Sequence, residues 1–196
     1  MSLDDRIRKQ FEESAELKRD AVRVLAGPIA TAVERITAAL ASDRKLLVCG
    51  NGGSAADSQH LAAELVGRYE RERPELAAIA LTTDTSILTA VANDYAFEQV
   101  FARQVRALGR EGDVLVAIST SGSSPNVLAA VEAARERDLV VIALTGRGGG
   151  QMAALLGDQD VHLCVPHQRT SRIQEVHLLI LHCLCDGIDA SLLGEE

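Results

Sequence analysis

The chain has 196 residues, of which 47% are hydrophobic and 24% are charged. These proportions are those of a globular protein with an ordinary core, and they exclude a disordered chain, a collagen and a coiled-coil rod. The formal net charge is −8, and Trp is absent. Without a basic block or a base-stacking surface, we expect a protein that binds neither nucleic acid nor an anionic membrane.

The leading segment predicts helices. Residues 4–25 carry twelve charges and an apolar stripe at helical spacing, which is typical of an amphipathic helix. Gly27 and Pro28 predict its end, and Pro28 suits the first turn of a second helix over 29–41. The stripe either packs on a partner chain or covers its own domain. We assign residues 1–42 to N-terminal oligomerisation helices.

From residue 44 onward, continuous runs of Val, Ile, Leu and Ala alternate with helical segments. Such runs are typical of a parallel sheet that is covered on both faces. We therefore predict a three-layer, flavodoxin-like α/β domain over 43–196, with five parallel strands in the order 2-1-3-4-5. The expected strands are 45–50, 76–82, 113–119, 139–146 and 160–166. The expected helices are 54–66, 85–92, 97–108, 124–137, a short one after the Gly-rich segment near 148, and 170–193.

The cysteines and the N-terminus indicate the compartment. The four cysteines form no C-x-x-C pair, and Cys49, Cys164 and Cys183 lie in apolar runs, where free Cys is a small core residue. The first residues lack the apolar segment of a secretory signal, and no uninterrupted apolar run reaches about 18 residues. We expect a reduced, cytoplasmic protein.

Two loops are expected to meet at the ligand-binding edge of the sheet. In open parallel sheets, ligands bind beyond the carboxyl ends of the strands where the strand order switches, here between the first and third strands. The first strand is followed by Asn51, Gly52 and Gly53. The carboxamide can orient a sugar hydroxyl, and the glycines permit close approach. A loop of this composition is weak evidence by itself.

The third strand ends in a hydroxyl-rich segment, residues 119–124, which we call the serine loop. Ser124 is a natural N-cap ahead of Pro125. Free N–H groups and the helix dipole favour an anion at such a helix start. No Lys follows in the pattern of a nucleotide P-loop, so a monophosphate ester is the better fit. A Ser/Gly turn with a good cap explains the loop equally well. Its candidate phosphate ligands are Ser119, Thr120, Ser121 and Ser124.

Two helices carry polar residues that suit catalysis. His60 and Glu64 are four residues apart, so an imidazole and a carboxylate share one helix face, where they bind a metal, share a proton or make only a surface contact. On the last helix, His182 is either a core histidine or a functional one. Gln174 and His182 are separated by roughly 12 Å along an α-helix. If both serve one site, we expect a neighbouring subunit to contribute one of them.

Five segments together resemble a known family, the bacterial phosphoheptose isomerases of the SIS (sugar isomerase) domain class. They are GNGGSAADSQHLAAEL, LTTDTSILTAVANDY, GDVLVAISTSGSSPNVLAA, ALTGRGGG and RIQEVHLLILHCLCD. The resemblance extends from the leading helix to the C-terminus. It implies conversion of D-sedoheptulose 7-phosphate to D-glycero-D-manno-heptose 7-phosphate through an enediolate, the first step of ADP-heptose synthesis for the lipopolysaccharide core. It also implies a homotetramer with composite sites.

The resemblance also implies roles for individual residues. Glu64 is the expected base and His182 the expected acid. The residues expected to contact substrate are Asn51, Gly52, Gly53, Glu64, Asn93, Asp94, Ser119, Thr120, Ser121, Ser124 and Gln174. The residues expected to hold one zinc ion per subunit are His60, Glu64, Gln174 and His182. Asn93 and Asp94 are by themselves a routine turn signal.

Two other functions are alternatives. The chain also resembles the DnaA initiator-associating protein, a SIS-fold adaptor of replication initiation. That adaptor lacks the full Glu/His pair, whereas this chain has both Glu64 and His182. A regulatory module that only senses a sugar phosphate would need the serine loop without the base. We therefore favour the enzyme.

Overall fold

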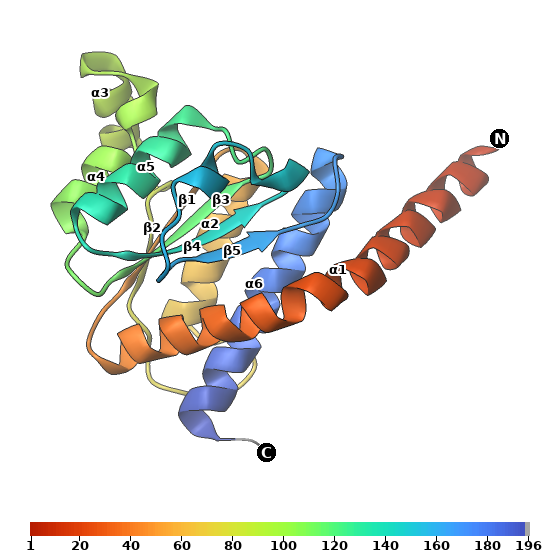
Figure 1. The fold of residues 1–196 in the computed structure, drawn as a ribbon, viewed down its shortest axis with the longest axis horizontal. Helices are drawn as coiled ribbons and strands as arrows, with labels where there is room; N and C mark the ends of the chain where they lie inside the picture. Colours follow the sequence, from red (N-terminus) through yellow and green to blue (C-terminus); the bar gives the residue numbers. More distant parts are fainter. Residues whose placement is uncertain (195–196) are drawn as a thin grey trace.

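The five apolar runs form one parallel sheet at the centre of the molecule (Figure 1). The computed structural model describes residues 1–194. The strand order is β2-β1-β3-β4-β5, and every neighbouring pair is parallel. The predicted fold class and strand order are therefore confirmed. The strands are β1 (Leu46–Gly50), β2 (Ala78–Ala80), β3 (Val114–Ser119), β4 (Val140–Thr145) and β5 (Val161–Cys164).

Helices cover both faces of the sheet and make it the middle of three layers. Alternate residues of a strand point to opposite faces. Leu46 and Val48 join the core beneath α1, α2 and α6, while Leu47 and Cys49 join the core beneath α4 and α5. The helices are α1 (Leu3–Ala41), α2 (Gly53–Val66), α3 (Thr85–Asp94), α4 (Ala102–Leu108), α5 (Pro125–Glu136) and α6 (Thr170–Leu193).

Short 3₁₀ turns replace helix in two places. The predicted helix over 97–108 is divided into a 3₁₀ turn, η1 (Phe97–Gln99), and the later helix α4. After β4, the Gly-rich segment forms the turns η2 (Arg147–Gly149) and η3 (Met152–Ala154) in place of the predicted short helix. Gly148, Gly149 and Gly150 all have positive φ angles, which interrupt a right-handed helix.

The leading segment forms one continuous helix, so our prediction of two helices was wrong. Pro28 lies inside α1. Proline lacks an N–H and costs one helical hydrogen bond. Leu25 and Ala32, on either side of Pro28, are both buried in the core. Packing on both sides of the proline therefore keeps the two halves in one rod.

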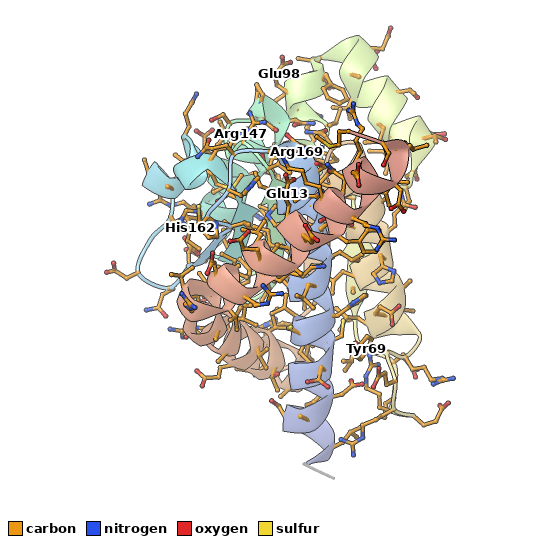
Figure 2. The ribbon with its side chains drawn as sticks, turned by 90° about the vertical axis from the view of Figure 1, so that its right-hand side faces the viewer. Glu13, Tyr69, Glu98, Arg147, His162 and Arg169 are labelled. Carbon is orange, nitrogen blue, oxygen red and sulfur yellow. The ribbon has the colours of Figure 1, made fainter. Side chains whose placement is uncertain are left out.

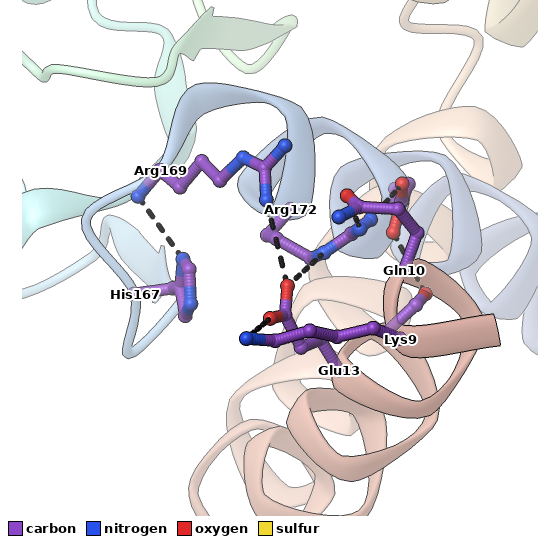
Figure 3. A network of polar contacts seen from close by, with 8 residues as sticks. Lys9, Gln10, Glu13, His167, Arg169 and Arg172 are labelled. Atoms are coloured by element: carbon purple, nitrogen blue, oxygen red, sulfur yellow. Dashed lines mark hydrogen bonds and ion pairs between the residues drawn. The ribbon is translucent and has the colours of Figure 1, made fainter. Parts of the chain in front are cut away.

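A polar network fastens the first half of α1 to the start of α6 (Figure 3). Glu13 pairs with Arg169 at 3.4 Å and lies 3.8 Å from Arg172. Lys9 lies 3.8 Å from the same carboxylate, and Gln10 Oε1 accepts a hydrogen bond from Arg172. Arg172 is buried, so these contacts hold part of the helix against the body of the domain.

The beginning of α1 nevertheless extends away from the domain (Figure 1). Leu3, Ile7 and Phe11 are 74%, 48% and 75% exposed. Large apolar side chains in one stripe are the usual mark of an interaction surface. In a single chain, this stripe is not covered by its own domain.

By length and composition, α1 and α6 are each apolar enough to cross a membrane. Helix α6 buries Ile173, Ile180 and Ile188 in the core against the sheet, and α1 buries Ile36 in the same core. Helix α6 and the part of α1 from Leu17 onward therefore pack as core helices in this fold.

Candidate functional site

The loops after β1 and β3 meet at the carboxyl edge of the sheet, as predicted. They enclose a hollow of about 280 Å³, which α6 closes from one side. This is the position at which open parallel sheets bind ligands. The residues that line it are Asn51, Gly52, Gly53, Ser54, Ile118, Ser119, Thr120, Ser124, Thr170 and Gln174. Ser54 and Thr170 were not among the predicted site residues.

The hydroxyl groups of the serine loop converge. Ser119 Oγ lies 2.9 Å from Ser124 Oγ and 3.4 Å from Ser121 Oγ. Ser124 is the N-cap residue of α5, yet its side chain makes no capping hydrogen bond and faces Ser119 instead. The start of a helix whose N–H groups lack a side-chain cap favours an anion. The geometry therefore fits a phosphate group.

The Gly-rich segment after β4 supports the serine loop from behind. Met152 N donates to Gly122 O at 2.8 Å. A Cβ on Gly122 would lie 1.9 Å from Gly149 O, and one on Gly150 would lie 2.3 Å from Ser121 O. Only glycines allow this approach. The run of glycines was visible in the sequence, but its position against the serine loop was not.

Asn51 is held by a partner that sequence reasoning missed. Asn51 Nδ2 donates to Asn126 Oδ1, and Asn126 Nδ2 donates to Asn51 Oδ1, both at 2.8 Å. Asn126 is only 2% exposed. The reciprocal pair fixes the loop after β1 against the start of α5, so the two ligand-binding loops form one rigid edge.

Three polar side chains meet where α2 faces α6. His60 Nε2 lies 3.0 Å from His182 Nε2 and 3.7 Å from Glu64 Oε1. The ring of Tyr69 lies 5.7 Å from that of His182. His60, Glu64 and His182 are each partly exposed, so they are accessible to a small molecule. A carboxylate beside two imidazoles can take up and release protons.

Gln174 lies apart from these groups, as its spacing from His182 predicted. A Cβ on Gly53 would lie 2.6 Å from Gln174 Nε2, so the amide packs directly on the loop after β1. Gln174 and His182 thus meet α2 at two successive places along α6. Gln174 lies at the hollow of the serine loop, and His182 lies at His60, with which it forms the histidine pair.

Asn93 and Asp94 do not join the hollow within one chain. They lie at the end of α3, both exposed, and Asn93 Nδ2 donates to Asp94 Oδ1 at 2.8 Å. Their predicted contact with substrate stays a prediction.

The donor types at the histidine pair fit zinc, which prefers imidazole nitrogen and carboxylate oxygen. Among residues 1–194, no group of three or more His, Cys, Asp or Glu side chains is placed to hold a metal ion. His60 and His182 offer two nitrogens, and Glu64 Oε1 is the next donor. A closed zinc site therefore needs a rotation of Glu64 or a further ligand.

A larger hollow, of about 610 Å³, lies between α1 and α6. It is lined by side chains such as Phe11, Lys18 and Glu175. Its lining includes no residue at the end of a strand, so it does not lie at the edge where open parallel sheets bind ligands.

Residues 10–146 match the SIS domain family. Phosphoheptose isomerase of Aromatoleum aromaticum is 68% identical over 100% of this chain and 99% of that protein. The counterpart in Azoarcus sp. is 66% identical over the full length of both. The chain belongs to the phosphoheptose isomerase family of SIS-domain proteins. The family resemblance predicted from the sequence is thus confirmed.

Solved structures agree with the assignment to the phosphoheptose isomerase family. The structure of phosphoheptose isomerase GmhA from Neisseria gonorrhoeae matches with a TM-score of 0.92 and 58% identity, over 96% of this chain and 100% of that chain. A phosphoheptose isomerase from Francisella tularensis matches with a TM-score of 0.94 and 46% identity, over 96% and 99%. These relatives favour the enzyme over the adaptor and the sensor.

Proposed function

We propose that this member of the phosphoheptose isomerase family converts D-sedoheptulose 7-phosphate to D-glycero-D-manno-heptose 7-phosphate. The observation that carries the proposal is that α2 and α6 together border the hollow of the serine loop and, further along the same two helices, carry Glu64 and the histidine pair. A phosphate anchored at one end of an extended sugar leaves the carbonyl end to reach the acid–base groups. This reaction is the first step of ADP-heptose synthesis for the lipopolysaccharide core.

The residue types account for the proton transfers. Glu64 removes a proton from C1 of the ketose, and His182 donates a proton to the carbonyl oxygen at C2, which gives an enediol. Loss of the proton from the C1 hydroxyl and return of a proton to C2 then form the aldehyde, so that no net proton is gained or lost. A carboxylate base with an imidazole acid is a common pairing for such transfers.

The serine loop supplies binding rather than chemistry. Its hydroxyls and the start of α5 hold the phosphate, which does not change during the reaction. Binding energy from a remote group positions the reacting carbons. Asn51 and Gln174, which line the same hollow, orient sugar hydroxyls.

We assign one zinc ion per subunit to His60, Glu64, Gln174 and His182, with a neighbouring subunit contributing either Gln174 or His182. Bound there, zinc would act as a Lewis acid toward the carbonyl oxygen. Support comes from the donor types and from the 3.0 Å separation of the two imidazole nitrogens.

We further propose a cytoplasmic homotetramer with composite sites. The exposed stripe of α1 supplies an apolar surface for a second copy. Asn93 and Asp94, which are exposed and outside the hollow of their own chain, would then line the site of a neighbour. Sedimentation at assay concentration tests the assembly, and a fully active monomer contradicts it.

An isomerase assay on sedoheptulose 7-phosphate, with and without chelator, tests the activity. Glu64→Gln keeps the size of the side chain but removes the basic carboxylate, and it should lower kcat by ~10²–10⁴-fold. The variant should keep its fold. If Glu64→Gln retained wild-type kcat, the base would lie elsewhere. If the wild-type chain gave no turnover with any heptose phosphate, the adaptor function would be favoured.

A further inference from the structure

The guanidinium of Arg73 is buried between the ends of α2 and α6. The Arg73 side chain is 1% exposed, and that of Asp189 is 4% exposed. Arg73 Nε donates to Asp189 Oδ1 at 2.6 Å. Arg73 Nη2 donates to Glu64 O at 2.8 Å, and Nη1 donates to Leu65 O at 2.9 Å. One planar group thus joins two backbone carbonyls of α2 to a carboxylate of α6.

The two carbonyls belong to the last turn of α2, which ends at Val66. The final carbonyls of a helix lack partners within the helix, and a cation there is favoured by the helix dipole. Arg73 therefore caps α2 at the residue that carries the proposed base, Glu64. It fixes the backbone from which the carboxylate extends.

On α6, the partner of Arg73 shares a face with the proposed acid. Asp189 follows His182 by seven residues, which is close to two full turns of an α-helix. The side of α6 that meets Arg73 is therefore the side that presents His182 to α2. The ion pair between Arg73 and Asp189 sets the position of α6 along α2. It thereby sets the distance and orientation between Glu64 and His182.

The segment that carries Arg73 also carries Tyr69, which lies beside α6 where the chain leaves α2 (Figure 2). The Tyr69 and His182 rings are 5.7 Å apart and tilted by 31°. Leu76 N donates to Leu65 O at 3.0 Å, so the segment folds back onto the end of α2. Arg73 lies between these two contacts and holds the segment in place.

We propose that Arg73, paired with Asp189, is a positioning residue of the isomerase reaction. The pair fixes α2 against α6, so that Glu64 and His182 face one substrate, and it seats Tyr69 against His182. This inference rests on the proposed function, because it takes Glu64 and His182 as the reacting pair. It assigns to Arg73 no contact with substrate.

The test needs a variant that keeps the fold. Removing one partner of a buried ion pair leaves an uncompensated charge, whereas replacing both partners by apolar residues of similar size is often tolerated. The double variant Arg73→Met/Asp189→Leu keeps the packing but loses the hydrogen bonds to the carbonyl oxygens of Glu64 and Leu65. We expect thermal unfolding within a few degrees of wild type, kcat lowered at least ~10-fold, and KM changed less than ~3-fold, because the serine loop is untouched.

A conservative variant gives a second, independent readout. Arg73→Lys keeps a positive charge for Asp189 but lacks the fork that reaches both carbonyls. We expect a kcat between those of wild type and the double variant. If the double variant did not fold, Arg73→Lys would decide alone: lowered kcat with unchanged KM supports the proposal, and wild-type kcat overturns it.

Arg106→Met is the matched control. Arg106 also pairs with a carboxylate, that of Glu136, at 2.7 Å, but both side chains are about half exposed and lie on the opposite side of the sheet. This variant should leave kcat and KM unchanged. A loss equal to that of the double variant would show that the effect is not specific to Arg73.

The imidazole NMR signals of His60 and His182 separate this inference from the proposed function. The chain has five His residues, and single His→Gln variants assign their signals. The double variant should shift the signals of His60 and His182 but not that of His167. If the wild-type chain gave no turnover with any heptose phosphate, the proposed function would fail, and the imidazole shifts would still judge whether Arg73 positions α2 against α6. Unshifted signals together with wild-type kcat would show that the pair only stabilises the fold.

Discussion

His60 and His182 are 122 positions apart in the sequence, and their Nε2 atoms lie 3.0 Å apart. A hydrogen bond between two imidazoles requires a donor N–H on one ring and a lone pair on the other. At least one ring is therefore neutral when the contact forms. A metal ion that accepts both lone pairs would replace the shared proton. The pair is thus suited to either role that we propose for it.

Replacing His182 should abolish turnover without loss of substrate binding. His182→Gln removes the proposed acid, and we expect kcat to fall by ~10²–10⁴-fold with little change in KM. Zinc analysis of the variant separates two causes. Retained zinc with lost activity identifies an acid, whereas lost zinc identifies a ligand. His167→Gln is the control. The ring of His167 accepts a hydrogen bond from the backbone N–H of Arg169, so this variant should remain active.

Removing a hydroxyl from the serine loop should have the opposite kinetic effect. Ser124→Ala deletes the group that lies 2.9 Å from Ser119 Oγ. We expect KM to rise by ~10-fold with kcat nearly unchanged, because the phosphate is held alike in the ground and transition states. Ser191→Ala, on the exposed surface of α6, should change neither constant. Equal turnover of a heptulose without phosphate would contradict a phosphate role for the loop.

A methyl group at Gly53 should disturb the site but not the fold. The added Cβ would lie 2.6 Å from Gln174 Nε2 and 3.2 Å from its Cδ, so the amide must move. We expect Gly53→Ala to lower kcat/KM by ~10-fold or more. Its thermal midpoint should stay near that of wild type, because Ala favours the helix that begins there.

Gly157→Ala is the matched control for this change. Among residues 1–194, a Cβ at Gly157 would meet only Asp160 Oδ2, at 3.7 Å, and Gly157 does not line the hollow. Activity should be unchanged. Wild-type kinetics in Gly53→Ala would show that the position of Gln174 does not matter for catalysis.

His177 should make the fold sensitive to acid. Its Nε2 donates to Thr145 O at 3.0 Å, and its Nδ1 is buried with no hydrogen-bond partner among residues 1–194. Burial lowers the pKa of His177 to about 4, against the opposing effect of the hydrogen bond to Thr145. Between about pH 6.5 and pH 4, His177 therefore binds a proton more readily in the unfolded chain than in the folded protein. Stability is full above that window and falls as the pH drops through it, by about 3 kcal/mol in all.

Urea unfolding of wild type and His177→Gln across this pH range measures that contribution. Glutamine keeps a donor for Thr145 O but cannot be protonated, so the free energy of unfolding of the variant should decline less as the pH falls. Direct NMR titration of the His177 ring should show it neutral down to about pH 5. Identical pH dependence in the two proteins would mean that another group is responsible.

Much of the fold follows from local sequence patterns. Apolar runs that end at Gly50 and at Ser119 predicted two neighbouring parallel strands, and the hydroxyls after Ser119 predicted the site edge. Strands buried on both faces must be apolar throughout, and helix starts must satisfy or expose their N–H groups. Those constraints act within a few residues, so they can be read from the sequence.

The helix boundary at Pro28 shows where local patterns fail. Proline normally ends a helix, because it lacks a donor and clashes with the preceding turn. Here the burial of Leu25 and Ala32 in one core outweighs that local cost. Contacts with the sheet and with α6 supply the energy that keeps the helix continuous through Pro28. Those contacts cannot be read from the sequence near Pro28.

The sequence by itself determined the sheet, its strand order, the serine loop and the residue types available for acid–base chemistry. Only the tertiary structure decided which polar groups pair: His60 with His182, Asn51 with Asn126 and Arg73 with Asp189. The members of each pair are more than 70 positions apart. Buried polar groups must find partners, but that rule does not name the partner. The packing of α2, α5 and α6 on the sheet fixes the choice, because it sets which side chains face one another.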